Sequence, residues 1–236
     1  MTEIELEGNI KLIGSGGVSK VYEGKINNIS KTKLVILKIG CNAKENFRNY
    51  TLIKTLQLPT LHFLKKGLYQ GRSIIITEHL NLNSDFIYVT PNSLISDSTK
   101  LLRELSAFKH AEKPDSIAEQ FRYNYKLKEI TNFEEFILST VEDLNKAAES
   151  KIVIDFDSYF IGSLKNEFKS SINYKIADFD HIYKCNKNTY EECFEGNKSE
   201  FARVMYQFLK YFVEEGNNKD SYNIIIDQIN ENDNLV

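Results

Sequence analysis

Tryptophan is missing from the sequence, and proline and cysteine are scarce, with three residues of each among 236. The cysteines Cys41, Cys185 and Cys193 form no C-x-x-C pair, and a disulfide between two of them would leave the third over. Such spacing is typical neither of a zinc site nor of a disulfide framework. A reducing compartment therefore suits the chain best.

The sequence also lacks long apolar runs and a dominant charge. No stretch of about 18 apolar residues occurs, and acidic residues stand where a secretory signal peptide has basic ones. We therefore expect a cytoplasmic protein without a membrane span, although delivery into a host by a dedicated secretion machine would leave no such signal. The 30 basic and 33 acidic residues are mixed along the chain, which argues against nucleic acid as a partner.

What the sequence does contain is enough apolar material for a packed core, with 42% hydrophobic residues. Hydrophobic periodicity predicts a β-rich first third. The expected elements are strands over 4–14, 20–26 and 34–40, a helix over 43–56, and a hairpin over 61–80. The apolar stripe of this helix is expected to comprise Phe47, Tyr50, Ile53 and Leu56.

The remainder of the chain has mainly helical periodicity. The expected elements are a polar linker or insertion over 81–100, helices over 99–111, 116–149, 198–215 and 221–230, and a β-hairpin formed by 151–156 and 173–179. The second helix is expected to bury Phe133, Phe136, Ile137, Val141 and Leu144. We therefore predict an α+β fold with a β-rich domain over 1–80 and a helical domain over 81–236.

A glycine-rich run, IGSGGVSKVYEGK, occupies residues 13–25 between two predicted strands. Glycines permit both a tight hairpin turn and a close approach of the backbone to a phosphate, so this run alone does not separate the two. Lys38 follows in the strand sequence VILK, and Asp178 lies far downstream in IADFD. Occurring in this order, the three features favour a phosphate-binding loop over a hairpin turn alone.

These motifs resemble those of the protein-kinase-like superfamily, and the chain is similar to its small, atypical members and to pseudokinases. GSGGVSKV matches G-x-G-x-x-G-x-V with Ser19 at the third glycine, VILK resembles V-A-I-K, and DFD resembles D-F-G with Asp180 at the glycine. The resemblance covers roughly residues 8–213. It implies a bilobal fold that binds ATP together with Mg²⁺ or Mn²⁺.

The resemblance also implies roles for individual residues. Lys38 would pair with the phosphates, and Asp178 with Asp180 would hold the metal. The residues expected around the nucleotide are Ile13, Gly14, Gly16, Gly17, Val21, Glu78 and Leu80, with the adenine bonded to backbone groups near the last two.

The catalytic loop departs from the family pattern H-R-D-x-x-x-x-N. Asp155 stands at the aspartate that accepts the substrate proton, but Val153 replaces the histidine and Phe160 the metal-binding asparagine. Asp157 is an alternative base or metal contact, because it would project to the same side of an extended segment. Asp155 is the first choice.

A second departure concerns the glutamate that pairs with the strand lysine in the family. Asn49 occupies this position, and Glu45, one turn earlier on the helix, is the alternative partner of Lys38. The plainer interpretation is that this ion pair is absent. His181 and the other three histidines show no ligand spacing and are expected to be structural or surface residues.

The expected function is transfer of the γ-phosphate of ATP to a hydroxyl group, with a protein as the first acceptor and a small molecule as the second. Two alternatives stay open. A pseudokinase would act by binding a protein partner, and a kinase-fold enzyme with reversed nucleotide would transfer the adenylyl group instead. Fold alone does not choose among them.

Overall fold

The computed structural model describes residues 1–6, 10–15, 19–25, 34–81, 84–89, 127, 129–164, 169–185 and 188–213. The chain divides into two compact units. The first unit comprises Met1–Ser84 and Ile176–Asp180, and the second comprises Asp85–Lys175 and His181–Val236. The predicted domain boundary after residue 80 stays a prediction.

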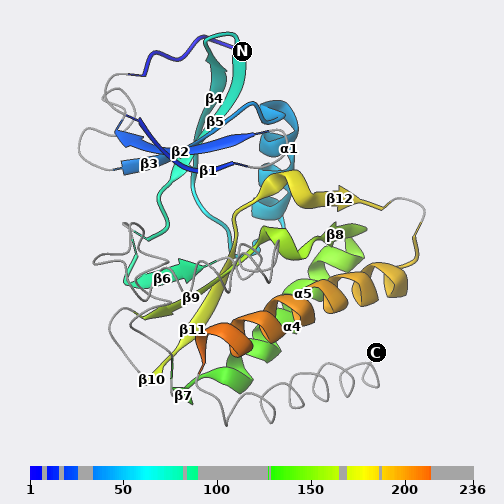
Figure 1. The fold of residues 1–236 in the computed structure, drawn as a ribbon. Coiled ribbons are helices and arrows are strands. Elements are labelled where there is room, and N and C mark those ends of the chain that lie inside the picture. Colours follow the sequence, from blue (N-terminus) through cyan, green and yellow to red (C-terminus); the bar gives the residue numbers. More distant parts are fainter. Residues whose placement is uncertain are drawn as a thin grey trace, which may run out of the picture. The chain divides into compact units, whose positions relative to one another are not determined.

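The first unit is built on a five-stranded antiparallel sheet with the order β1-β2-β3-β5-β4 (Figure 1). Its strands are β1 (Ile10–Ser15), β2 (Lys20–Lys25), β3 (Leu34–Ile39), β4 (Phe63–Tyr69) and β5 (Arg72–Glu78). The two-residue turn between β4 and β5 contains Gln70 and Gly71, both with positive φ, which is typical of a tight hairpin. In the described residues, the predicted second and third strands and the predicted hairpin with its turn at Gly71 are confirmed.

Alternation along β3 separates the two faces of this sheet. Val35, Leu37 and Ile39 are buried in one apolar cluster with Ile74 and Ile76 of β5. Lys38, between Leu37 and Ile39, projects to the opposite face, where Ile75 of β5 is its strand partner. The alternation therefore places the charged Lys38 side chain on the face opposite this apolar cluster.

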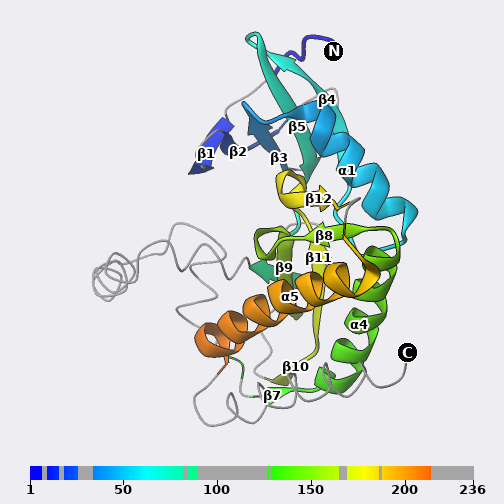
Figure 2. The same ribbon diagram turned by 90° about the vertical axis from the view of Figure 1, so that its right-hand side faces the viewer.

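Helix α1 (Ala43–Thr55) lies beside β4 and β5 within the first unit (Figures 1 and 2). Asn42 begins it, since its side chain accepts a hydrogen bond from the Glu45 N–H. The predicted apolar stripe is partly wrong, because Phe47 is 38% exposed while two asparagines are buried. The buried residues of α1 are Ala43, Asn46, Asn49, Tyr50 and Ile53.

The N-terminal residues pair with β4 rather than extending β1. The Ile4 N–H donates to Leu68 O at 2.7 Å, and the Leu68 N–H donates to Thr2 O at 3.0 Å. A Cβ added to Gly67 would lie 2.5 Å from Thr2 O, so only glycine allows this close backbone approach. The predicted strand over 4–14 is therefore too long, and β1 begins only at Ile10.

The described residues of the second unit form two long helices and several short sheets. The helices are α4 (Phe133–Glu149) and α5 (Tyr190–Phe212), which pack against each other. The strands are β6 (Phe86–Val89), β7 (Glu129–Ile130), β8 (Ile152–Ile154), β9 (Tyr159–Leu164), β10 (Lys169–Ser170), β11 (Ile172–Ile176, whose last residue belongs to the first unit) and β12 (Ile182–Lys184). Short 3₁₀ turns cover Phe156–Ser158 and Phe179–His181.

The predicted β-hairpin of 151–156 with 173–179 is wrong. Strand β8 pairs with β12, and β11 lies beside β9 in the order β11-β9-β6. The stretch between the two segments, which was predicted to be a polar connection, contains strand β9, whose residues are mostly buried. The predicted linker is also partly wrong, because Phe86–Val89 forms strand β6 and pairs with β9.

Helix boundaries differ from the predictions at their first turns. Helix α5 begins at Tyr190 rather than at 198, because Thr189 forms a capping box with Glu192. Helix α4 begins at Phe133, and it buries Phe136, Ile137, Val141 and Leu144 as predicted. The predicted helical stretch over 116–126 lies outside the described residues. Phe133 is only half-buried. The predicted helices over 99–111 and 221–230 lie outside the described residues.

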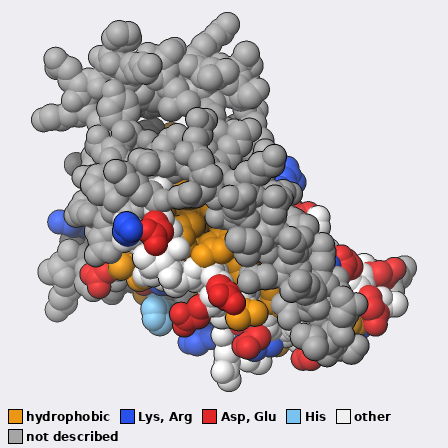
Figure 3. Space-filling model, turned by 90° about the horizontal axis from the view of Figure 1, so that it is seen from below, with side chains coloured by type: hydrophobic (Ala, Val, Ile, Leu, Met, Phe, Trp, Pro, Cys, Tyr) orange, Lys and Arg blue, Asp and Glu red, His pale blue; other side chains and the backbone are white. Residues whose placement is uncertain are grey.

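An aromatic cluster forms the core of the second unit. Phe201 of α5 lies 5.5 Å from Tyr159, 6.1 Å from Tyr174 and 6.0 Å from Phe136, measured between ring centroids. Hydrophobic side chains also gather on the face shown in Figure 3, where Asp and Glu side chains lie along their border. In the part of the chain that is described, no helix is long and apolar enough to cross a membrane.

The predicted fold class is confirmed. The chain is an α+β protein. Among its described residues, one compact unit is a β-sheet with one long helix, and the other contains two long helices. This division matches the β-rich and helical lobes expected from the sequence motifs.

Candidate functional site

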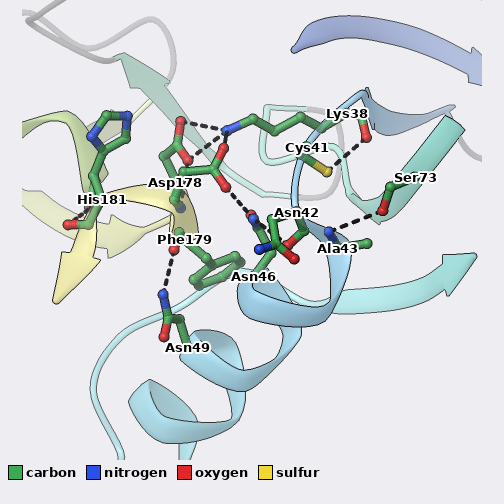
Figure 4. A network of polar contacts seen from close by, with 12 residues as sticks. Lys38, Cys41, Asn42, Ala43, Asn46, Asn49, Ser73, Asp178, Phe179 and His181 are labelled. Atoms are coloured by element: carbon green, nitrogen blue, oxygen red, sulfur yellow. Dashed lines mark hydrogen bonds and ion pairs between the residues drawn. The ribbon is translucent and has the colours of Figure 1, made fainter. Parts of the chain in front are cut away.

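Lys38 is the centre of the polar network of the first unit (Figure 4). Its ammonium lies 2.7 Å from Oδ1 and 2.9 Å from Oδ2 of Asp178, and 2.7 Å from Oδ2 of Asp180. The Lys38 side chain is only 14% exposed, and those of Asp178 and Asp180 are 28% and 22% exposed. The structure therefore joins the predicted strand lysine to both carboxylates of the DFD motif, 140 and 142 residues further along the chain.

The backbone around Asp178 positions the two carboxylates. Asp178 precedes the 3₁₀ turn Phe179–His181, and its Oδ1 accepts the Asp180 N–H at 3.1 Å. Phe179 is fully buried, with its ring 5.5 Å from Tyr50 of α1 and 6.5 Å from Phe63 of β4. Burial of this ring anchors the motif, so that both aspartates are held at the sheet face that carries Lys38.

Helix α1 contributes two asparagines to the same network. Asn46 donates to Asp180 Oδ1 and also, at 3.0 Å, to Asn42 O. Asn49 donates to the backbone oxygen of Phe179 at 2.8 Å. Glu45, the alternative partner for Lys38, instead accepts from Asn42 and from Arg48 on the exposed side of the helix. The plainer interpretation, without a helix glutamate on Lys38, therefore agrees with the structure.

The electrostatics of this network favour the charged lysine. Burial alone would lower the pKa of Lys38, but the adjacent Asp178 and Asp180 outweigh it and raise the pKa above the ordinary lysine value. Cys41, whose thiol lies 3.3 Å from Lys38 O, has its pKa raised to about 11 by burial and by the nearby Asp180. Lys38 is therefore an ammonium at neutral pH, and Cys41 is a thiol.

The glycine run connects β1 with β2, as predicted. Gly14 pairs with Val21, and Val21 in turn pairs with Lys38, so these residues form one row across the sheet. Ile13 is bulged out of the strand register and is 48% exposed. A Cβ at Gly14 would meet only Val21 Cβ at 3.9 Å, which leaves open space above the strand. Gly16 and Gly17 lie outside the described residues.

Glu78 and Leu80, the predicted adenine contacts, lie at and just after the end of β5. The backbone N–H of Glu78 donates to His62 O at 2.9 Å, and its side chain accepts the His62 N–H at 2.9 Å. Leu80 is half-buried. His79, between them, is buried and bonds to Glu23 of β2 at 3.0 Å.

Asp155 and Asp157 belong to the second unit, just after β8. Asp155 Oδ1 accepts the Asp157 N–H at 3.2 Å, which caps the 3₁₀ turn Phe156–Ser158. One ligand atom from each of Asp155, Asp157 and His181 lies within 4.8 Å of the others. Sequence reasoning missed His181, because the pairing of β8 with β12 that brings it to this turn could not be read from residue spacing.

Phe160, at the position of the family's metal-binding asparagine, lies in β9 and is half-buried. Asn46 was also missed. The sequence did indicate that Asn46 needs a polar partner, because two asparagines three residues apart lie on the buried side of an amphipathic helix. The partner itself, Asp180, could not be read from the sequence.

Comparisons with known proteins give likenesses among solved structures. No protein-family model matches the sequence, and no curated protein matches it. Among solved structures, the chain is similar to a crystal structure described as the kinase domain of PF14_0431, with 11% sequence identity and a TM-score of 0.43. The match covers 84% of this chain, and the chain spans 62% of that kinase domain.

The residues of the first unit fit a divalent cation and a phosphate. Asp178 and Asp180 direct carboxylate oxygens to one point, now taken by the Lys38 ammonium, and oxygen ligands are what Mg²⁺ and Mn²⁺ accept. The open space above Gly14 lies in the row of strand residues that ends at Lys38. A polyphosphate with its metal is therefore the ligand class that this charge pattern fits.

Proposed function

We propose that this chain is a small, atypical phosphotransferase of the protein-kinase-like type, which transfers the γ-phosphate of ATP to a hydroxyl group. The observation that carries the proposal is the convergence of Asp178 and Asp180 on Lys38. A lysine and two acidic residues brought together on a sheet face, beside a glycine run, form the set that phosphoryl transfer needs. Such transfer depends mainly on holding phosphates and neutralising their charge.

Lys38 pairs with the phosphates of the nucleotide, and Asp178 with Asp180 holds the metal. When bound, the divalent cation supplies positive charge that stabilises the transferring phosphoryl group. Gly14 permits close approach of the backbone, because no side chain occupies the space above it. Gly16 and Gly17 do the same by analogy with the motif. Ile13 and Val21 contact the adenine, which bonds to backbone groups near Glu78 and Leu80.

Asp155 acts as the base that accepts the proton of the acceptor hydroxyl. Its backbone is held on both sides, since its N–H donates to His181 O at 3.0 Å and its carbonyl accepts the Ser158 N–H at 2.9 Å. Asp157 remains the alternative base. The acceptor is the hydroxyl of a protein, and a small-molecule hydroxyl is the second choice.

A pseudokinase that binds a protein partner is the second candidate function, and two observations favour it. Phe160 offers no metal ligand from β9, and Asn46 and Asn49 occupy the buried side of α1 where the family has a glutamate. Under this alternative the network would serve only to hold the DFD motif.

The test is transfer from γ-labelled ATP with Mg²⁺ or Mn²⁺ to the protein itself, to a protein mixture and to small hydroxyl compounds. We compare the wild type with Asp178→Asn, which keeps the side-chain shape but removes the charge. Asp85→Asn is the matched control, because Asp85 is exposed and belongs to the second unit. We expect Asp178→Asn to lose at least about a hundredfold in rate, in line with the loss of a charge-stabilising group.

Three further results decide between the alternatives. Asp155→Asn should reduce transfer more than Asp157→Asn, and the reverse order would assign the base to Asp157. If an acceptor is labelled by α-labelled ATP but not by γ-labelled ATP, the reaction is adenylyl transfer and not phosphoryl transfer. Absence of label on every acceptor class, with folded protein, would contradict the enzyme and leave the pseudokinase.

A further inference from the structure

Asp155, Asp157 and His181 form a compact cluster in the second unit, with ligand atoms that all lie within 4.8 Å of one another. All three side chains are half-buried, so they are partly desolvated and still open to an ion. We propose that this cluster binds a first-row divalent transition cation, such as Mn²⁺ or Zn²⁺. This is a second metal site, with different ligands from the Asp178 and Asp180 pair of the first unit.

The backbone holds the three ligands in place. Strands β8 and β12 are antiparallel with Ile154 opposite Ile182, so Asp155 and His181 are adjacent at one end of the two-stranded sheet. The Asp155 N–H donates to His181 O at 3.0 Å, and the Ser158 hydroxyl donates to the same oxygen at 3.3 Å. The 3₁₀ turn, capped by Asp155, then places Asp157 beside them. Little conformational entropy remains to be lost when an ion binds.

The donor set selects the class of cation. Mg²⁺ and Ca²⁺ are hard ions that take oxygen ligands, whereas imidazole nitrogen is a characteristic ligand of transition ions. Catalytic zinc sites have three protein ligands and keep a further position for water or substrate, and this cluster also offers three ligands. The affinity order of such ions predicts that Zn²⁺ binds more tightly than Mn²⁺, and that Mg²⁺ binds poorly.

The surrounding charge is also favourable to a cation. Glu200 of α5 lies near the cluster, and its carboxylate faces the Phe156 N–H at 3.4 Å. Arg203, which acts on Glu200, has its guanidinium 3.6 Å above the Phe156 ring. The neighbourhood thus holds more carboxylates than cationic side chains among the described residues.

The site is independent of the proposed function in its ligand His181, although it shares Asp155 and the alternative base Asp157 with it. The experiment therefore measures metal binding directly and without nucleotide.

Binding of Mn²⁺ to the full chain is measured by the loss of the electron paramagnetic resonance signal of the free ion. The variants are His181→Ala and Asp157→Asn, with His62→Ala as the matched control, because His62 is exposed and belongs to the first unit. We expect a site in the wild type and the control, and at least about a tenfold weaker one in each ligand variant. Asp178→Asn should keep it, and Zn²⁺ but not excess Mg²⁺ should displace Mn²⁺.

Two results would overturn the proposal. One is equal Mn²⁺ binding by wild type and His181→Ala, with circular dichroism showing that both are folded. The other is displacement of Mn²⁺ by Mg²⁺ at similar concentration. Mn²⁺ binding that depends on His181, without any phosphate transfer, would support this site and contradict the proposed function. Phosphate transfer without Mn²⁺ binding that depends on His181 would support the proposed function and contradict this site.

Discussion

Lys38 forms ion pairs with two carboxylates, those of Asp178 and Asp180. It is therefore both a candidate phosphate ligand and a residue that stabilises the first unit. Its ammonium is the only lysine or arginine charge paired with Asp178 and Asp180 among the described ion pairs. Because three side chains share partial burial, removal of one charge leaves the others without compensation. Loss of activity in a Lys38 variant must therefore be interpreted together with its stability.

Lys38→Met should lower the free energy of unfolding at pH 7 by about 1 to 3 kcal/mol. A fully buried pair would cost more, but the two carboxylates are partly solvated. Since the folded-state pKa of Lys38 lies above its ordinary value of 10.5, its stabilising contribution is complete below that pH and is lost as pH rises through the folded-state value.

The measurement is urea denaturation of both proteins by circular dichroism at pH 7, 9 and 11, because the chain has no tryptophan for fluorescence. The difference between wild type and variant should be equal at pH 7 and 9 and smaller at pH 11. Tyrosine ionisation affects both proteins alike and cancels in this difference. A difference that grows above pH 10.5 would contradict the prediction.

At the scale of elements, the side chain of Asn197 joins helix α5 to strand β8 through two hydrogen bonds. Its side-chain oxygen accepts the Ile154 N–H at 2.8 Å, and its amide donates to Ile152 O at 2.8 Å. Asn197 is fully buried. Strand β8 ends just before Asp155. The two hydrogen bonds of Asn197 therefore also support the loop that carries the candidate base and metal ligands.

Asn197→Ala should reduce the free energy of unfolding by about 2 to 4 kcal/mol, because two buried backbone groups of β8 lose their partners. Ser199→Ala, an exposed change on the same helix, is the control and should be nearly neutral. Both are compared with wild type by urea denaturation. Equal stability of the two variants would show that β8 finds other partners.

Strand β4 gives a second prediction at this scale, through its contact with the N-terminal residues. Gly67→Ala should cost about 1 to 3 kcal/mol, because the new methyl group would lie 2.5 Å from Thr2 O. The same change in a chain that lacks residues 1–6 should cost much less. An equal penalty in both backgrounds, measured by thermal unfolding, would place the conflict elsewhere.

At the scale of the whole molecule, each unit has an aromatic residue at the centre of its own core. Phe179 is fully buried between α1 and β4 of the first unit, and Phe201 is 1% exposed within the second. The first unit takes Phe179 from a segment far along the chain. Its stability therefore depends on residues beyond its N-terminal part.

Phe179→Ala and Phe201→Ala should each lower stability by about 3 to 5 kcal/mol, as deletion of a buried ring does. Hydrogen exchange should distinguish them. Phe179→Ala should reduce protection first in α1 and β4, and Phe201→Ala first in α5 and β9, because each ring packs in a different core. Identical exchange patterns for the two variants would mean that the units unfold as one.

The first third of the chain was predictable because its structure is local. Antiparallel strands joined by short turns can be predicted from alternating apolar and polar residues and from a glycine in the turn. The hairpin at Gly71 was predicted correctly for this reason. The second unit was harder. Strand β9 lies in a stretch that reads as polar, and the pairings of β8 with β12 and of β6 with β9 join segments separated by long connections.

The sequence by itself determined the α+β class, most of the apolar face of helix α4, and the identity of Lys38, Asp178 and Asp155 as residues worth testing. Motif order and periodicity are properties of the chain, so no coordinates were needed for them. Only the tertiary structure decided that Asp180 shares Lys38, that Asn46 bonds to Asp180, and that His181 joins Asp155 and Asp157. These are contacts across many residues, which depend on strand pairing and core packing rather than on spacing along the chain.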